Sequence, residues 1–343
     1  MRSTIAIVCA LAAVSCQRNT VRAILPADVR IDVFPQVARA QLDALFVVDN
    51  SKFMAVHQKR VADSFHRFVE YLARNQMDWH LGLVTSDVSA SPGVYQGGGD
   101  RKYFASSDSE VAQKVAQAVV ALGNTGSAIS AVLEQADLSL RGPPDGFLRA
   151  GAALFVMLVT DNNDPWSPGE DLYYYRALKQ AKGAGNDGLV RMSAVAGPPP
   201  SGCTIPDPSN PQNTFVAQAA PRLQGLAEET SGRFHSLCDP AFDLVFDELG
   251  ATAAGLKRAF RLAKVPDLAT LVVTVRAPCD VSRDALASCA QVSDECGEAV
   301  PGLACTPGSG AWAWDESTNS IVFSREAIPP RGSSVEAQYK ERK

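Results

Sequence analysis

The hydrophobic and polar positions of the chain alternate between strand and helix patterns from residue 41 to about residue 258. Two continuous apolar runs, "ALFVVD" at 44–49 and "ALFVMLVTD" at 153–161, are typical of strands buried on both faces. Apolar residues at helical spacing, such as Val61, Phe65 and Leu72, predict a helix after the first run. Similar patterns predict strands at 80–87, 189–197 and 232–238, and helices at 107–122, 127–140, 171–182, 216–230 and 242–257.

This alternation predicts an α/β domain over residues 41–258. Its fold class is a doubly wound, mostly parallel sheet with helices on both faces. In such sheets, ligands bind at the carboxyl ends of the strands, near the point where the strand order reverses. The Pro- and Ser-rich residues 197–212 interrupt the pattern and predict a long surface loop.

The pattern changes after residue 258. Residues 259–343 hold short strand-like runs separated by turn residues, which predict a small β-rich C-terminal region. Apart from Cys9 and Cys16, the cysteines show no C-x-x-C pair, so disulfides are favoured over a zinc site. Cys203 and Cys238 are expected to pair, and the connectivity of the other four stays open: Cys279, Cys289, Cys296 and Cys305.

The first sixteen residues have the features of an export signal. Arg2 precedes an apolar run that is too short to span a bilayer, and small residues then lead to Cys16. The segment 13–16 resembles a bacterial lipobox, which implies that Cys16 is lipidated and that residues 17–40 form a tether. Gln17 after the cysteine favours the outer over the inner membrane. An ordinary cleaved signal with a chance cysteine is the alternative.

Composition and motifs narrow the function classes. The net charge of -5, without a cluster of Lys and Arg, excludes a nucleic-acid binder. Neither the G-x-S-x-G motif of hydrolases nor a phosphate-binding P-loop occurs. We therefore expect a protein that is not an enzyme, with a hydrolase as the remote alternative.

Oxygen-bearing side chains follow the predicted strands. Asp49 and Ser51 come after the first strand, Thr125 lies in a loop between two helices, and Asp161 follows the second apolar run. A doubly wound sheet would bring these side chains to one edge. Carboxylates and hydroxyls suit Mg²⁺ or Mn²⁺. Trp166 and the tyrosines at 173–175 place aromatic side chains nearby, either as a recognition patch or as helix packing.

A family resemblance is carried by three segments, "VVDNSKFM", "GNTGSAIS" and "LVTDNND". Through these segments, residues 40–258 resemble the von Willebrand factor type A (VWA) domain family. The resemblance implies a metal-ion-dependent adhesion site made by Asp49, Ser51, Thr125 and Asp161. The chain departs from the pattern at Phe53, where the family has a second serine that ligates the metal. In the alternative reading the site is vestigial, with Phe53 packed at the helix start and Asp49 capping the helix.

The resemblance is closer to exported bacterial lipoproteins that carry this domain. It implies a lipid-anchored protein of the cell envelope that presents a binding or adhesion module to an unknown protein partner, with Mg²⁺ or Mn²⁺ as possible cofactors. A metal-independent interaction scaffold is the alternative function.

Overall fold

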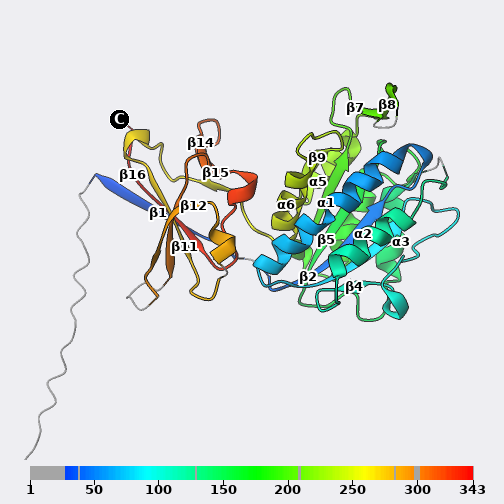
Figure 1. Cartoon of the computed structure of the whole chain (residues 1–343), viewed down its shortest axis with the longest axis horizontal. Helices are drawn as coiled ribbons and strands as arrows, with labels where there is room; N and C mark the ends of the chain where they lie inside the picture. The colour runs from blue at the N-terminus through cyan, green and yellow to red at the C-terminus, as the bar shows by residue number, and fades with distance from the viewer. Residues whose placement is uncertain are drawn as a thin grey trace, which may run out of the picture.

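The structure is a computed structural model that describes residues 28–37, 39–127, 130–207, 210–281, 283–296 and 302–342. The expected signal over residues 1–16, the expected lipidation site Cys16 and the first part of the tether lie outside the described residues. Figure 1 shows two units side by side, an α/β domain on the right and a β-rich domain on the left. No described helix is both long and apolar enough to cross a membrane.

A six-stranded sheet forms the centre of the α/β domain (Figure 1). All neighbouring strands are parallel except the edge strand β4, which runs antiparallel to β3. Since β2 lies between β3 and β5, the strand order reverses at β2, and this is where open α/β sheets bind ligands. In spatial order the strands are β4 (Phe104–Ala105), β3 (Asp78–Thr85), β2 (Gln41–Val48), β5 (Ala153–Val159), β6 (Val190–Ala196) and β9 (Phe234–Ser236).

Helices cover both faces of this sheet because the side chains of its central strands alternate between two cores. Ala44 and Phe46 of β2 belong to one core, whereas Leu45 and Val47 belong to the other. The predicted mostly parallel sheet between helices is confirmed. The first core is covered by α1 (Ala55–Arg74), α2 (Val111–Ala121) and α6 (Phe242–Ala253), and the second by α3 (Val132–Arg141), α4 (Asp171–Gln180) and α5 (Pro221–Glu229).

The surface loop predicted over 197–212 is wrong. The chain there forms a β-hairpin of β7 (Cys203–Asp207) and β8 (Asn210–Ala217), and the following helix begins at Pro221 rather than at residue 216. Phe215 and Ala217 turn inward while Val216 is exposed, which is the two-residue period of a strand. The prolines and serines around this short run hid the pattern from the sequence.

The β-rich domain consists of two antiparallel sheets around a third hydrophobic core. Its first strand is β1 (Val29–Pro35), which pairs with the last strand, β16 (Ser334–Lys340). The tether predicted over 17–40 is therefore wrong for residues 29–35. The other strands are β11 (Val272–Ala277), β13 (Leu303–Pro307) and β12 (Cys289–Asp294) in the larger sheet, and β10 (Ala259–Arg261), β15 (Ser320–Phe323) and β14 (Trp312–Asp315) in the smaller one.

Three disulfides join the six described cysteines. Cys203 and Cys238 are bonded, as predicted, and lie in the α/β domain. In the β-rich domain the connectivity that the sequence left open is Cys279 with Cys296 and Cys289 with Cys305. Each crosslink restricts the unfolded chain and typically contributes about 2–4 kcal/mol to the free energy of unfolding.

Polar contacts hold the two domains against each other. The amide of Gln36 donates to the carbonyl oxygen of Lys257 at 2.7 Å, and the backbone N–H of Arg331 donates to the side chain of Asn75 at 2.9 Å. Arg325 forms ion pairs with Asp239 at 3.1 Å and with Glu248 at 3.0 Å. The segment before β2 and the segment after α6 are therefore both fixed at the junction.

A buried ionic cluster lies at the opposite edge of the sheet from the carboxyl ends of β2 and β5. The carboxylate of Asp43, on β2, is fully buried. It accepts hydrogen bonds from the guanidinium of Arg149 at 2.8 Å and from the ammonium of Lys182 at 3.1 Å. The charges satisfy one another, so the cluster is tolerated in the core.

We expect Asp43→Ala to destabilise the protein by about 3–5 kcal/mol, because it leaves the buried Lys182 and Arg149 without their shared counterion. The control is Asp63→Ala, which removes an exposed partner of Lys59 and should cost at most about 0.5 kcal/mol. Urea denaturation followed by circular dichroism measures both values. Equal losses in the two variants would contradict the role given to the cluster.

Two buried histidines make the fold sensitive to acid. His57, on α1, is 1% exposed and packs edge-on against Phe215 of the hairpin. Burial, and to a lesser degree the nearby Arg60, lowers the pKa of His57 to about 4, and burial likewise lowers the pKa of His235 to about 4. Because the folded state favours the neutral rings, their contribution to stability is present above about pH 6.5 and is lost as the pH falls towards 4.

We expect His57→Phe to reduce this acid-dependent loss of stability by an amount on the order of 3 kcal/mol between pH 6.5 and pH 4. The matched control is His66→Phe, an exposed position on the same helix. The free energy of unfolding as a function of pH is measured for the three proteins. If the His57→Phe curve runs parallel to the wild-type curve, burial of a neutral His57 does not cause the acid sensitivity.

Candidate functional site

The candidate site is built on Asp49, the first residue after β2. Its backbone N–H donates to the carbonyl oxygen of Val159 at 2.8 Å, which carries the pairing of β2 with β5 one step beyond the strands. The carboxylate is fully buried. It accepts hydrogen bonds from the backbone N–H of Ser51 at 2.8 Å, from the hydroxyl of Thr160 at 2.6 Å and from the hydroxyl of Ser86 at 3.2 Å. Asp49 is thus oriented by three donors.

Asp161 is the second buried carboxyl group of the site. Burial, and then repulsion from Asp49, raises the pKa of Asp161 to about 7. Within the part of the chain that the structure describes, no Lys, Arg or His forms an ion pair with either carboxylate. Two neighbouring buried carboxylates without a positive partner are unfavourable unless one is protonated or a cation is bound. The pair therefore fits a cation.

The ligands for such a cation would be mostly neutral oxygens. In the described ranges, no three His, Cys, Asp or Glu side chains gather as a metal cluster. The hydroxyl of Ser51 lines the same pocket as Asp161. The amide of Asn162 donates its NH2 group towards Asp49 and Asp161, at 3.5 Å from each, and its oxygen accepts from the backbone N–H of Asp164 at 2.8 Å. Two carboxylates, a hydroxyl and water suit the hard cations Mg²⁺ and Mn²⁺.

Phe53 lies at the mouth of the site and does not fill it. Its side chain is 64% exposed, and it is the middle residue of a short 3-10 turn, Lys52–Met54, that leads into α1. Phe53 thus lies on the surface at the helix start rather than packed beneath it, and a vestigial site stays the alternative prediction. Lys52 beside it is also exposed. The chain thus presents an aromatic ring and an ammonium group at the position where the family resemblance implies a hydroxyl.

Thr125 lies in a loop that reaches the site, although its own side chain is exposed. The N–H of the next residue, Gly126, donates to the carbonyl oxygen of Asn50 at 3.0 Å, and Gly126 lines the pocket. A Cβ at position 126 would lie 2.5 Å from the end of the Asn50 side chain, so a larger residue there would have to displace that side chain. Among the described residues, no hydrogen bond joins Thr125 to Asp49 or Asp161. The structure thus brings together Asp49, Ser51 and Asp161, with Thr125 at the rim.

Sequence reasoning missed the residues that hold Asp49 in place. Thr160 and Ser86 donate to its carboxylate, and Gln58 of α1 donates to its backbone carbonyl oxygen at 2.8 Å. A signal for two of them was present. Thr160 directly follows β5 and Ser86 directly follows β3, so both share the sheet edge with Asp49. Gln58 carried no such signal.

The hairpin β7–β8 forms one wall of the site. A pocket of about 510 Å³ lies between this hairpin and the turn that holds Phe53. The backbone N–H of Gln218, directly after β8, donates to the carbonyl oxygen of Asp161 at 2.7 Å. The residues that line the pocket are Ser51, Lys52, Phe53, Gly126, Asp161, Asn162, Thr214, Val216 and Gln218.

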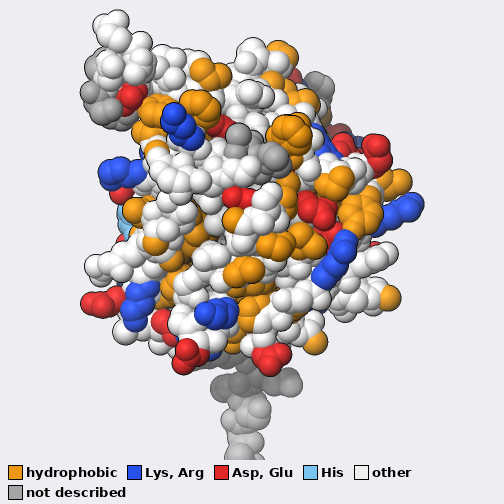
Figure 2. Space-filling model, turned by 90° about the vertical axis from the view of Figure 1, so that its right-hand side faces the viewer, with side chains coloured by type: hydrophobic (Ala, Val, Ile, Leu, Met, Phe, Trp, Pro, Cys, Tyr) orange, Lys and Arg blue, Asp and Glu red, His pale blue; other side chains and the backbone are white. Residues whose placement is uncertain are grey.

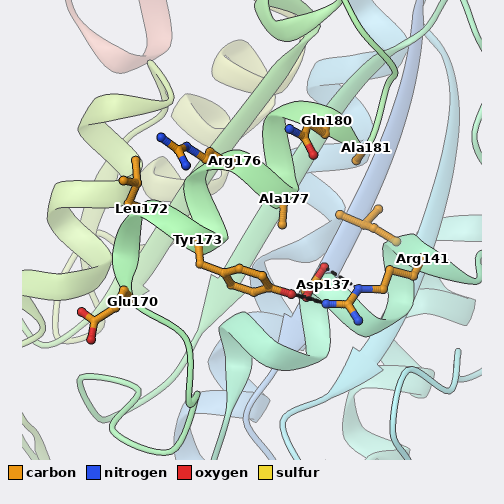
Figure 3. Close-up of a pocket in the computed structure, with 10 residues that line it drawn as sticks. Asp137, Arg141, Glu170, Leu172, Tyr173, Arg176, Ala177, Gln180 and Ala181 are labelled. Atoms are coloured by element: carbon orange, nitrogen blue, oxygen red, sulfur yellow. Dashed lines mark hydrogen bonds and ion pairs between the residues drawn. The ribbon is translucent and has the colours of Figure 1, made fainter.

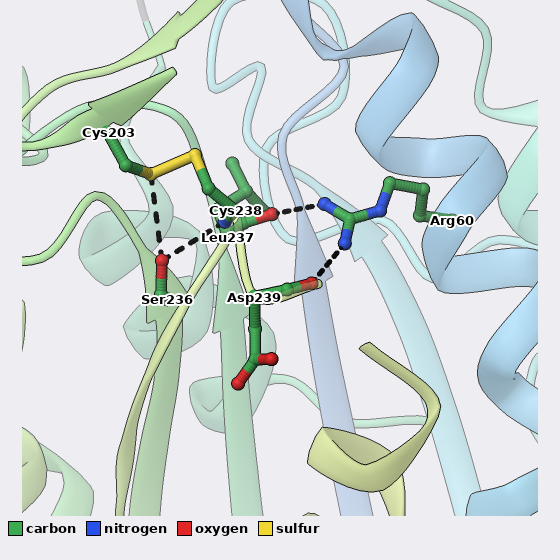
Figure 4. Close-up of a disulfide and its surroundings, with 6 residues drawn as sticks. All are labelled: Arg60, Cys203, Ser236, Leu237, Cys238 and Asp239. Carbon is green, nitrogen blue, oxygen red and sulfur yellow. Dashed lines mark hydrogen bonds between the residues drawn. A yellow bond between two sulfur atoms is a disulfide. The ribbon is translucent and has the colours of Figure 1, made fainter. Parts of the chain in front are cut away.

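The disulfide Cys203–Cys238 attaches the base of the hairpin to the end of β9 (Figure 4). Figure 4 also shows Arg60 of α1, whose guanidinium donates to the carbonyl oxygen of Leu237 at 2.5 Å and to that of Asp239. The hydroxyl of Ser236 lies 3.6 Å from the sulfur of Cys203. The helix that starts at the site and the wall of the pocket are therefore held by one local network.

A second pocket, of about 730 Å³, lies between α3 and α4 (Figure 3). Figure 3 shows the hydroxyl of Tyr173 directed at Asp137, which also pairs with Arg141, so the polar groups there are largely used. Tyr174 is buried, and its hydroxyl donates a hydrogen bond to the carboxylate of Glu134. Tyr174 therefore packs its helix against the core and does not belong to a recognition patch.

Comparisons with known proteins leave the family open. No family model matches the chain, and no curated protein matches it by sequence. Among solved structures, an aerotolerance-related membrane protein from Bacteroides fragilis, carrying multiple mutations to serine, is similar over 61% of this chain and 98% of its own, with 14% identity and a TM-score of 0.35.

Two further solved structures show similar likeness. The pilus adhesin SpaC from Lactobacillus rhamnosus GG matches 91% of this chain and 43% of its own, with 12% identity and a TM-score of 0.40. Proximal thread matrix protein 1 from the mussel byssus matches 67% of this chain and 51% of its own, with 8% identity and a TM-score of 0.40. At TM-scores of 0.35–0.40, these likenesses identify no family, so the function has to be derived from the site.

Proposed function

We propose that this protein is a binding module with a VWA-like fold, and that it engages a protein partner at the edge of the sheet where β2 meets β5. The observation that carries the proposal is the pair of buried carboxyl groups, Asp49 and Asp161, of which Asp161 lines an open pocket and Asp49 lies behind it. The strand order, the oxygen set around this pair and the pocket mouth all support a site for recognition. The proposed cofactor is Mg²⁺ or Mn²⁺.

The residues of the site have separate tasks in this proposal. Asp49 is held by Thr160 and Ser86 and in turn fixes the backbone of Ser51. Ser51 and Asp161 face the pocket and would hold the cation, and the NH2 group of Asn162 donates to the two carboxylates. When bound, the cation supplies the positive charge that attracts a carboxylate of the partner. Phe53 removes one hydroxyl from this set, which we expect to weaken cation binding by about 10–100-fold.

The proposed location is the bacterial cell envelope, where the chain would be anchored by lipid at Cys16, with the outer membrane favoured. The disulfides among the six described cysteines support a protein made for an oxidising compartment. Within the described residues, no hydrogen bond joins a serine of the site to a histidine, so we propose binding rather than hydrolysis.

A second candidate function is metal-independent binding by the same surface. The exposure of Phe53 and Lys52 favours it, because an aromatic ring and an ammonium group can contact a partner without a cation. The two candidates differ in their response to a chelator.

We expect Mg²⁺ or Mn²⁺ at about 10 mM to raise the melting temperature of the wild-type protein by a few °C over a chelator control, through preferential binding to the folded state. Phe53→Ser should increase this shift, since it restores an oxygen. Phe53→Ala is the matched control, because it removes the ring without supplying a ligand, and its shift should stay near the wild-type value. Differential scanning calorimetry of the three proteins measures the shifts.

The shift should disappear in Asp49→Ala, even if that variant melts at a lower temperature. Calcium at the same concentration serves as the control for nonspecific ionic effects. If neither the wild type nor Phe53→Ser responds to Mg²⁺ or Mn²⁺, the cation is not part of the function and the metal-independent candidate stands.

A further inference from the structure

The pocket above the carboxyl pair has an apolar rim. Phe53 and Val216 are 64% and 55% exposed and line the same pocket from opposite walls, one from the 3-10 turn and one from β8. Large apolar side chains exposed side by side in one pocket are typical of a contact surface. Figure 2 shows one face of the molecule, on which apolar side chains form patches with charged side chains between them.

The wall made by β8 presents a regular row of side chains. Thr214 and Val216 are two residues apart on β8, so they share one face of the strand at a spacing of about 6.7 Å, and Gln218 directly follows the strand; all three line the pocket. Polar groups on either side of an apolar one match the repeat of an extended peptide, whose backbone groups need donors and acceptors.

This wall is held in place rather than loosely attached. On the opposite face of β8, Phe215 packs on His57, and Ala217 is fully buried. At the base of the hairpin, a Cβ on Gly202 would lie 2.2 Å from the carbonyl oxygen of Ala217, and φ of Gly202 is +74°, so the chain can approach so closely only at a glycine. A wall fixed in this way can select a partner by shape.

The charge at the pocket mouth is positive. Lys52 is exposed, and among the described residues it forms no ion pair. The other ionisable group of the lining, Asp161, is 8% exposed and lies at the floor. An incoming acidic group would therefore meet an unpaired ammonium first, next to the ring of Phe53.

We infer that the partner of this pocket is an extended protein segment in which an apolar side chain stands beside a carboxylate. The apolar side chain lies between Phe53 and Val216, and the carboxylate pairs with Lys52. The side chains of Thr214 and Gln218 form hydrogen bonds with the backbone groups of the partner segment on either side of the apolar residue. This inference rests on the proposed binding function and adds the chemistry of the partner to it.

The test uses a phage-displayed library of random linear peptides, selected on the wild-type protein in Mg²⁺ buffer and again with chelator. We expect the enriched peptides to carry an apolar residue next to Asp or Glu. By fluorescence anisotropy, Phe53→Ala, which removes the ring without adding an oxygen ligand, should weaken the best peptide about tenfold, as the loss of one partly buried aromatic contact implies. Lys52→Glu should weaken it several-fold, and more at low salt.

Two variants serve as matched controls: Leu268→Ser, an apolar side chain that is 50% exposed in the β-rich domain, and Lys114→Glu, an exposed lysine on α2. Both should leave the affinity unchanged. Enriched peptides without the acidic–apolar pair, no enrichment at all, or binding to the Phe53→Ala and Lys52→Glu variants as tight as to the wild type would overturn the inference. None of these results bears on the Mg²⁺-dependent melting shift, so the proposed function fails or stands separately. Motif-bearing peptides that bind in chelator support the inference and favour the metal-independent candidate.

Discussion

The parallel pairing of β2 with β5 is the constraint on which the candidate site depends. It extends one residue past the strands, through the bond from the N–H of Asp49 to the carbonyl oxygen of Val159. This register places a fully buried carboxylate beside the residue two positions after β5, which is Asp161. Such a pair is costly in a low-dielectric interior, and hydroxyl and backbone donors offset part of the cost. The unfavourable charge is therefore a consequence of the register and marks the place where a cation or a proton is needed.

The rest of the site is assembled around this pair by segments that are remote in sequence. Arg60 of α1 binds the carbonyl oxygens of Leu237 and Asp239, and Cys238 between them is bonded to Cys203 at the base of the hairpin. The hairpin then returns to the floor through the bond between Gln218 and Asp161. Floor and wall are thus linked by hydrogen bonds and a covalent bond.

The sequence was a good guide where the determinants are local. The two apolar runs placed Asp49 and Asp161 at strand ends, and a parallel sheet then had to bring them to one edge. It failed where the partner is distant or the signal is short. Strand β1 was taken for a tether because it pairs with β16 at the other end of the chain, as Val29 with Lys340. Thr125 was placed in the correct loop, but the direction of its side chain depends on how Gly126 packs on Asn50, which no local pattern reveals.

In the proposed function, positions 52 and 53 decide how the site recognises its partner. A bound cation attracts a carboxylate and discriminates little beyond it, because the ion is a point charge. Replacing a hydroxyl by an exposed aromatic ring weakens the ion's hold, and it adds apolar contact area at the same spot. Lys52 adds a fixed positive charge next to that ring. In the binding mode that we propose, the two residues shift recognition from charge alone towards charge combined with shape, which requires the rigid wall that β8 supplies. If residues 203–217 formed a flexible loop instead of a hairpin, no fixed side chain would lie opposite the ring of Phe53.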